Sequence, residues 1–277
     1  MSDISIDRDK CIRCEACVET CPVHIFFMAD SEVRLHHEKE CMVCGHCAAV
    51  CPVEAVIHKG LDLSGFLPAP EGMAFSPESL YSFLRSRRSC RVYETKEIPR
   101  QILEKLIDIA RYAPTGFNRQ NFEFIVVQDK AKVERLSRMA AAFFGNLLKE
   151  IEASPETHPF KKMVYEFRMD NEYLLQGKDR IFRGAPVVIL VHAPTDIGAS
   201  IDNCLYSVFH MVMMAETLGL ATCINRRFLV AVDRVPEIQR ELGVPTGHKI
   251  FGCVTVGFPR YKFNSLPSRK PPKVKWL

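Results

Sequence analysis

The sequence predicts an α+β protein in two parts, a small cysteine-rich N-terminal domain and a larger body of interleaved helices and strands. Eight of the twelve cysteines lie in the first 51 of the 277 residues. Beyond residue 76, apolar residues recur at helical spacing in some segments and form short continuous runs of strand length in others. A chain of this length accommodates one sizeable domain and a second, smaller one.

The cysteine-rich region is an internal repeat. A quartet of cysteines at positions 11, 14, 17 and 21 recurs thirty residues later at positions 41, 44, 47 and 51, and each quartet is followed by Pro-Val. A repeat of this size indicates a duplicated supersecondary unit, so we expect a domain at 1–60. Glycine and proline residues interrupt the pattern at 61–76, which indicates a linker. The second domain then spans 77–277.

The body alternates predicted helices with predicted strands. Ser76 followed by Pro77 is a typical helix start, and the helix is expected to end near residue 86. Further helices are expected at 99–112, 130–151, 160–176 and 199–218, and strands at 122–127, 187–191, 221–225 and 249–256. The helix at 199–218 is apolar on most faces, so we expect it to be buried as a central helix or in a subunit interface.

Composition and charge favour a soluble protein that binds different ligands at its two ends. The N-terminus does not resemble a secretory signal, and no apolar run reaches the roughly 18 residues of a membrane span. We therefore expect a cytoplasmic location, where cysteines stay reduced. Residues 1–60 carry a net charge of −4, which leaves +8 on the remainder of a chain with net charge +4. The basic body suits a phosphate-bearing cofactor, and a basic surface without a ligand is the alternative.

Each cysteine quartet follows the pattern C-x₂-C-x₂-C-x₃-C-P. Three thiolates at these gaps can bind three corners of a [4Fe–4S] cluster, and in two-cluster ferredoxins the fourth thiolate binds the other cluster. This rule predicts two ligand sets, Cys11, Cys14, Cys17 and Cys51 for one cluster, and Cys41, Cys44, Cys47 and Cys21 for the other. Zinc is the alternative, although structural zinc sites normally use two separated ligand pairs. The repeat resembles the bacterial two-cluster ferredoxins, which implies one-electron transfer.

The other cysteines and two histidines of the body are interpreted as structural. Free cysteine is commonly a small buried residue, and this interpretation applies to four positions, Cys90, Cys204, Cys223 and Cys253. His192 and His210 have no partner at ligand spacing in the sequence, so we expect neither to bind a metal.

The body has no dinucleotide-binding G-x-G-x-x-G and no P-loop, so side chains would have to hold a cofactor phosphate. The segment 85–91 combines guanidinium groups with hydroxyls, which suits a phosphate monoester. Arg269-Lys270, in a proline-rich C-terminal tail, is a second candidate.

Four segments in order resemble the motifs of the FMN-dependent nitroreductase family: Arg87-Arg88-Ser89-x-Arg91, residues 113–120, Leu218-Gly219-Leu220 and residues 256–259. The resemblance covers about residues 77–272. It implies an α/β sandwich with a mixed, mainly antiparallel sheet, and a homodimer with FMN at the subunit interface. The cofactor contacts that it implies are Arg87, Arg88, Ser89, Arg91, Pro114, Thr115, Gly116, Asn118, Asn203, Cys223, Ile224, Asn225, Arg269 and Lys270.

The chain departs from the family pattern at two places. Asn121 stands where proline is usual, and Arg226-Arg227 replaces a stretch that usually contains glycine near the reactive edge of the flavin. We interpret a cation at the second place as a group that stabilises anionic reduced flavin.

These resemblances imply a flavin-dependent oxidoreductase without a protein nucleophile, because N5 of the flavin carries the chemistry. We expect ferredoxin or another redox protein to supply electrons through the clusters to FMN, and a small electrophile such as a nitroaromatic or a quinone to be reduced. NAD(P)H is a further candidate donor. One alternative is an electron-transfer adaptor that sends electrons from NAD(P)H-reduced FMN outward to a protein partner. Another is a flavin-remodelling or dehalogenating enzyme. We expect no nucleic-acid or membrane partner, since the basic residues lack interleaved aromatics.

Overall fold

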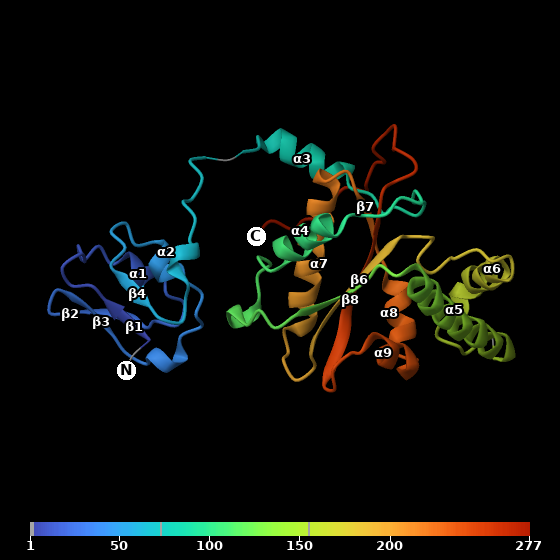
Figure 1. The fold of residues 1–277 in the computed structure, drawn as a ribbon, viewed down its shortest axis with the longest axis horizontal. Coiled ribbons are helices and arrows are strands. Elements are labelled where there is room, and N and C mark those ends of the chain that lie inside the picture. The colour runs from blue at the N-terminus through green and yellow to red at the C-terminus, as the bar shows by residue number, and fades with distance from the viewer. Residues whose placement is uncertain (1–2, 73, 155) are drawn as a thin grey trace. The chain divides into compact units, whose positions relative to one another are not determined.

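The structure is a computed structural model that describes residues 3–72, 74–154 and 156–277. Met73, in the predicted linker, and Pro155, between two predicted helices, lie outside the described residues. The chain divides into two compact units (Figure 1). The first contains the residues up to Ala74 together with Gly116–Arg119, and the second contains Phe75–Thr115 and Gln120–Leu277.

The first unit is a duplicated fold of two short β-ribbons and two short helices. Strand β1 (Ile4–Ile6) pairs antiparallel with β4 (Val56–His58), and β2 (Phe26–Ala29) pairs antiparallel with β3 (Glu32–Leu35). Helices α1 (Ala16–Thr20) and α2 (His46–Ala49) each contain the third cysteine of a quartet. Two 3₁₀ turns, η1 (Glu38–Glu40) and η2 (Leu63–Gly65), complete it.

The backbone of the first unit repeats every thirty residues, as the sequence does. Left-handed φ angles recur in pairs, at Arg13 and Val43, at Glu15 and Gly45, and at His24 and Glu54. Left-handed backbone is uncommon outside glycine. Its recurrence at three matched positions shows that the two quartets fold as copies of one unit.

The second unit is built on a four-stranded sheet. The strands are β5 (Glu123–Val127), β6 (Val187–Pro194), β7 (Ala221–Ile224) and β8 (His248–Gly257). Their order in the sheet is β5-β6-β8-β7, and all three pairings are antiparallel. Residues 187–191 in β6 are fully buried, because this central strand is covered on both faces, and its continuous apolar sequence fits that position.

Helices cover both faces of this sheet (Figure 1). On one face, α4 (Arg100–Ala110) and α7 (Ser200–Thr217) pack against alternate β6 residues such as Val187 and Ile189. On the other face, α5 (Lys130–Ala153) and α8 (Arg226–Val232) pack against Val188 and Leu190. The remaining helices are α3 (Pro77–Ser86), α6 (Val164–Leu175), which follows the turn η4 (Lys161–Met163), and α9 (Pro236–Leu242). The α+β sandwich is the predicted fold class.

Helix α7 differs from the expectation in one respect. One side of it packs on the sheet, but Ile201, Leu205, Tyr206 and Phe209 on its other side are 40–49% exposed. Because these side chains are exposed in the single chain, α7 is not the central helix that was one of the two expectations, and its place in a subunit interface stays a prediction. The short helices α8 and α9, and the 3₁₀ turn η3 (Gly116–Asn118), were not predicted.

Candidate cluster and cofactor sites

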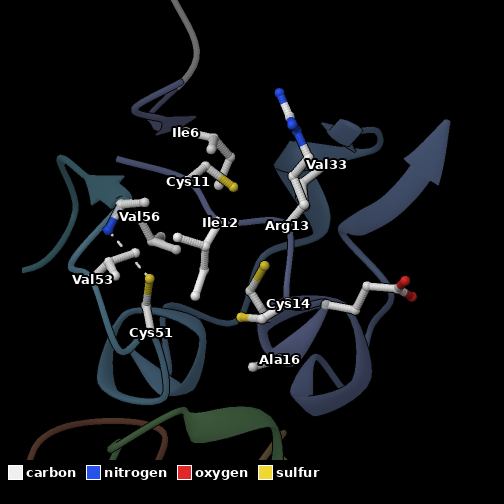
Figure 2. Close-up of a pocket in the computed structure, with 13 residues that line it drawn as sticks. Ile6, Cys11, Ile12, Arg13, Cys14, Ala16, Val33, Cys51, Val53 and Val56 are labelled. Atoms are coloured by element: carbon white, nitrogen blue, oxygen red, sulfur yellow. Dashed lines mark hydrogen bonds between the residues drawn. The ribbon is translucent and has the colours of Figure 1, made fainter. Parts of the chain in front are cut away.

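The first unit holds two cavities, and residues of both repeats line each of them. The first cavity encloses about 320 Å³ of free space, counting its open mouth, and its walls include Ile6 and Val33. Four cysteines line it, namely Cys11, Cys14, Cys17 and Cys51. Figure 2 shows the sulfur atoms of Cys11, Cys14 and Cys51 facing the same space. Cys51 comes from the second repeat, so the first cavity is completed across the duplication.

A second cavity repeats this arrangement with about 330 Å³ of free space. The cysteines that line it are Cys21, Cys41, Cys44 and Cys47. The structure therefore brings together the two quartets that the spacing predicts. Burial raises the pKa of the Cys47 thiol to about 11, and repulsion from the other three thiolates adds to the rise. Four thiolates around one cavity repel one another, so a positively charged group must bind between them. The core of an iron–sulfur cluster is such a group, and cysteine thiolates are its usual ligands.

Backbone amides point at the sulfur atoms of the fourth cysteines. The amide of Ile25 donates to Cys21 Sγ at 3.3 Å, and that of Ala55 donates to Cys51 Sγ at 3.2 Å. Each donor follows its cysteine by four residues, so the pair is another product of the duplication. Hydrogen bonds to thiolate sulfur stabilise its negative charge and are among the factors that set cluster potentials.

His58 makes the two cavities unequal. It is 3% exposed, lines the second cavity, and its Nε2 lies 3.5 Å from Cys41 Sγ. The amide of Gly60 donates to His58 Nδ1 at 3.1 Å. Because Nδ1 accepts this bond, the neutral ring carries its proton on Nε2 and donates it toward the sulfur. The position equivalent to His58 in the first repeat is Met28, whose side chain has no N–H donor.

In the second unit, the segment that carries the predicted phosphate ligands is fastened to the sheet. The amide of Cys90 donates to the carbonyl of Thr222 in β7 at 2.8 Å. The hydroxyl of Tyr93 lies 3.1 Å from the carbonyl of Cys90 and 2.8 Å from Thr255 Oγ1 in β8. A Cβ at Gly257 would lie 2.5 Å from the Tyr93 ring. Because Gly257 has no side chain, the ring of Tyr93 can pack directly against the backbone of β8.

The other predicted cofactor contacts differ in burial and in the elements that carry them. Ile224 is 44% exposed at the end of the edge strand β7, next to half-buried Cys223. Asn203 is 1% exposed and donates to Asn121 Oδ1 at 2.9 Å, so the residue that replaces the family's proline is held by a buried amide. Arg269 and Lys270 lie in an exposed tail without regular secondary structure.

The loop after α4 carries four further predicted contacts, among them Pro114. Thr115 Oγ1 accepts a hydrogen bond from the amide of Gln120 at 3.2 Å. Gly116 and Asn118 belong to the first compact unit, in which Asn118 Nδ2 donates to the carbonyl of Val43 at 2.9 Å.

Arg183 is a candidate ligand that the sequence interpretation missed. It is half-buried, and its backbone is left-handed, with φ of 60°. Burial lowers the pKa of Arg183, and repulsion from Arg180 and Arg91 lowers it further. Within residues 3–72, 74–154 and 156–277, no carboxylate forms an ion pair with Arg183. A half-buried cation beside another cation fits an anionic ligand. The signal was a second arginine three residues after Arg180, just before β6.

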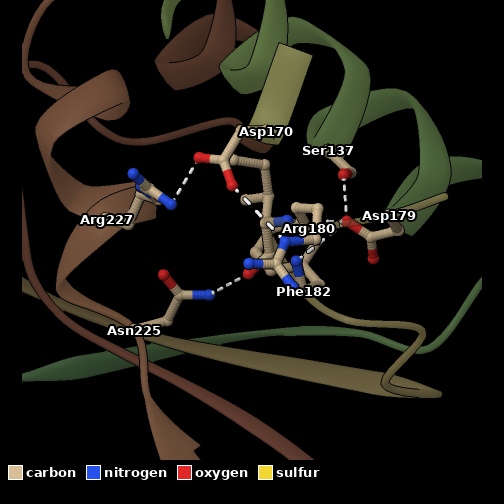
Figure 3. Close-up of polar contacts among 8 residues, drawn as sticks. Ser137, Asp170, Asp179, Arg180, Phe182, Asn225 and Arg227 are labelled. Carbon is tan, nitrogen blue, oxygen red and sulfur yellow. Dashed lines mark hydrogen bonds and ion pairs between the residues drawn. The ribbon is translucent and has the colours of Figure 1, made fainter. Parts of the chain in front are cut away.

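Arg227 forms an ion pair with the buried carboxylate of Asp170 (Figure 3). Asp170 is 3% exposed and contacts Arg227 Nη1, and Arg180 Nε lies 3.5 Å from Asp170 Oδ1. The Arg227 guanidinium also lies over the ring of Phe144, 5.2 Å from its centroid. Its charge is therefore balanced within the chain, whereas Arg226 is exposed. The stabilisation of reduced flavin by this pair stays a prediction.

Asn225 has a structural task at the same place. Its Nδ2 donates to the carbonyl of Ile181 at 2.7 Å, and its Oδ1 accepts from the amide of Phe228 at 2.9 Å, which caps α8. Ile181 and Asp179 both belong to the loop between α6 and β6. The Oδ1 atom of Asp179 accepts a hydrogen bond from the Ser137 hydroxyl at 2.5 Å, which holds the start of this loop. These bonds fix the loop that carries Arg183.

A separate cavity of about 1730 Å³ of free space lies beside α5, with Gln128 and Asp179 in its walls. None of the predicted cofactor contacts lines it. No helix among the described residues has the length and apolar character needed to cross a bilayer.

A duplicated eight-cysteine unit joined to a three-layer sandwich that bears a cationic cluster defines a modular redox protein. Residues 84–258 match the model of the nitroreductase family, and residues 4–58 match that of the 4Fe-4S dicluster domain. The first match covers more than half of the chain. This protein therefore belongs to the nitroreductase family and carries a 4Fe-4S dicluster domain at its N-terminus.

Known proteins resemble the second unit. The iodotyrosine deiodinase of Haliscomenobacter hydrossis is 31% identical over 208 residues, which cover 69% of this chain and 83% of that protein. The 4-nitrobenzoate reductase of Nocardioides sp. is 23% identical over 204 residues, which cover 65% and 81%. Among solved structures, an FMN-bound nitroreductase from Bacteroides fragilis has a TM-score of 0.54 at 23% identity, covering 70% of this chain and 94% of that one. A BluB-like flavoprotein from Clostridium difficile has a TM-score of 0.56 at 19% identity, covering 72% and 96%. These structural similarities show the fold.

Proposed function

We propose that this protein is an FMN- and iron–sulfur-dependent oxidoreductase that receives electrons at its N-terminal domain and reduces a small electrophile, such as a nitroaromatic or a quinone, on its second domain. The observation that supports this most is the presence of two cysteine quartets, each around its own cavity, in the same chain as a nitroreductase body. When bound, the clusters carry single electrons and FMN exchanges electrons one or two at a time.

Each cluster would be held by three cysteines of one repeat and the fourth of the other. The donor chemistry supports this, since four cysteines line each cavity. Replacing Cys51 with serine is expected to disturb the cluster of Cys11, Cys14 and Cys17 rather than the other. Electron paramagnetic resonance of the reduced protein, which resolves two interacting clusters, measures this.

Arg91 and Arg183 would bind an anionic group of FMN, together with the predicted Arg87, Arg88 and Ser89. The support is electrostatic, because Arg183 and Arg91 repel each other in the chain alone and a phosphate would relieve that repulsion. We expect Arg183→Leu to raise the Kd for FMN by about tenfold or more, the effect of losing a charge-assisted hydrogen bond. Arg100→Leu is the matched control, because its side chain is 86% exposed and pairs with Glu104 on the same helix.

A second copy of the chain would cover the exposed apolar side of α7. Ile201, Leu205, Tyr206 and Phe209 recur at the spacing of one helical face, which supports the predicted homodimer with FMN at its interface. Phe209→Glu is expected to give monomers in light scattering after size-exclusion chromatography and to release FMN. A dimer that retains FMN in this variant would contradict the arrangement.

The electron donor decides between the proposed reductase and an electron-transfer adaptor. Anaerobic stopped-flow spectroscopy with reduced ferredoxin, NADH and NADPH in turn, observing flavin and cluster absorption separately, makes the distinction. Cluster reduction by ferredoxin before the flavin signal changes supports the reductase. Flavin reduction by NAD(P)H, followed by the clusters, would instead favour outward transfer to a protein partner.

Reductive dehalogenation is a second candidate activity. The relative that favours it is the iodotyrosine deiodinase of Haliscomenobacter hydrossis, at 31% identity over 208 residues. Anaerobic incubation of the reduced protein with 3-iodotyrosine, measured as iodide release, tests it against 4-nitrobenzoate reduction under the same conditions. Iodide release without nitro-group reduction would make dehalogenation the activity of the second domain.

A further inference from the structure

Two histidines and a glutamate from three neighbouring strands meet near one end of the sheet. Glu123 begins β5, His192 lies near the end of β6, and His248 begins β8. Glu123 is directly opposite His192 in the β5–β6 pairing, and His248 is opposite Pro194 in the β6–β8 pairing. Side chains two residues apart on a strand share a face, so this register places both imidazoles on the same side. The fold therefore gives His192 possible ligand partners that its spacing in the sequence does not reveal.

The ligand atoms are close enough to share one ion. His192 Nδ1 lies 3.0 Å from His248 Nδ1, and His248 Nδ1 lies 4.0 Å from Glu123 Oε1. One atom from each of the three residues lies within 4.8 Å of both others. A tetrahedral Zn²⁺ with bonds of about 2.0–2.1 Å holds two nitrogen ligands about 3.3 Å apart. The two imidazoles are thus already near the separation that a shared metal requires.

A bulge in the β6–β8 pairing contributes to this placement. The β6–β8 register shifts between Val191 and His192. Bulges redirect side chains and are frequent beside functional sites. The pairing runs from Val191 opposite Gly252 to His192 opposite Ile250, so the extra residue lies on β8. Without the bulge, every β8 residue beyond it would change faces relative to β6, and His248 would turn away from His192.

Burial and access also suit an ion. His192 is 3% exposed, the side chain of His248 is 17% exposed, and that of Glu123 is 62% exposed. The site is therefore closed on the side of the core and open to solvent at the carboxylate. Two facing Nδ1 atoms can form a hydrogen bond only if one of them carries the proton, whereas a metal ion binds the lone pairs of both. Two imidazoles and one carboxylate form a donor set typical of zinc and of non-haem iron.

We propose that Glu123, His192 and His248 bind a divalent first-row transition-metal ion, for which Zn²⁺ is the probe. The ion would link β5, β6 and β8 across the sheet and would leave a coordination position open toward solvent. The site shares no residue with the cysteine quartets or with the predicted flavin contacts, so it is independent of the proposed oxidoreductase function.

The test uses the full-length protein with its clusters and flavin loaded, under anaerobic conditions. Zn²⁺ is added at one to two equivalents with a chromophoric chelator as competitor, while cluster absorption is followed to show that the cysteines stay occupied. His248→Gln and Glu123→Gln are the test variants because both side chains reach solvent and their loss should not prevent folding. His210→Gln is the matched control, since its Nδ1 is 2.9 Å from the carbonyl of Tyr206 on its own helix.

We expect wild type and His210→Gln to bind one more Zn²⁺ than either test variant under these conditions. In His248→Gln and Glu123→Gln the affinity for that ion should be lower by about tenfold or more. Zinc X-ray absorption of the wild-type protein should show nitrogen and oxygen neighbours without sulfur at about 2.3 Å, the Zn–S distance. Equal binding by all four proteins would overturn the proposal, and so would a sulfur shell around the zinc. Retention of full affinity by Glu123→Gln alone would overturn the three-ligand site.

Discussion

Tyr93 joins the fold of the second unit to its candidate cofactor site, so removal of its hydroxyl tests the whole arrangement. The hydroxyl bridges the carbonyl of Cys90, within the segment predicted to bind phosphate, and Thr255 Oγ1 on β8. Tyr93→Phe keeps the ring that packs against Gly257 and removes only this bridge. The change therefore loosens the segment without opening a cavity.

The magnitude follows from the contacts. Two hydrogen bonds at about 0.5–1.5 kcal/mol each set an upper range of about 1–3 kcal/mol. Thr255 Oγ1 is buried but keeps the carbonyl of Cys223 as an acceptor at 3.3 Å, so it is not left without a partner. We therefore expect a loss of about 1–2 kcal/mol. For a domain of this size, that corresponds to a decrease in Tm of about 2–8 °C.

The assay is thermal unfolding of the loaded protein under anaerobic conditions, together with FMN titration by flavin fluorescence. If about 1 kcal/mol of segment ordering is lost, the Kd for FMN should rise by about fivefold. Tyr165→Phe is the control, because Tyr165 is 71% exposed. Unchanged Tm and unchanged Kd in Tyr93→Phe would refute the reasoning. A lower Tm with an unchanged Kd would show that the segment does not bind the cofactor.

Three further predictions follow from single contacts. Gly252→Ala is expected to cost about 1–3 kcal/mol of unfolding free energy, because its Cβ would lie 2.6 Å from a side-chain carbon of α7. Gly198→Ala, with no atom within 4 Å, is the control in parallel denaturant titrations. His58→Phe removes an N–H donor to a cluster cysteine, so the reduced cluster should lose about 1 kcal/mol of stabilisation and its potential should fall by about 40 mV. A redox titration monitored by electron paramagnetic resonance measures this, and equal potentials in both proteins would exclude the role. Asp170→Ala leaves Arg227 without its buried partner and should destabilise the protein by about 2–3 kcal/mol, measured as a lower denaturation midpoint. An unchanged midpoint would contradict this.

The sequence predicted the features that depend on local spacing. The quartets repeat within 51 residues, so the duplication and its two ligand sets could be inferred without coordinates. Helix α3 begins at Pro77, as its capping residue Ser76 indicates, and Ser76 Oγ accepts a hydrogen bond from the amide of Ser79 at 3.2 Å. The continuous apolar run at 187–191 predicted a strand, which is part of β6. In each case the information lies within a few turns of chain, which is where steric and capping preferences act.

What only the tertiary structure decided depends on contacts between distant residues. The strand order β5-β6-β8-β7 and the bulge in β6–β8 bring Glu123, His192 and His248 together across 125 residues of sequence. Arg183 became a candidate ligand only when the fold brought it within electrostatic reach of Arg91. The charge of Arg227 proved to be balanced by Asp170. No periodicity encodes these meetings, because sheet register and helix packing are set by the burial of the whole core and not by the residues that meet.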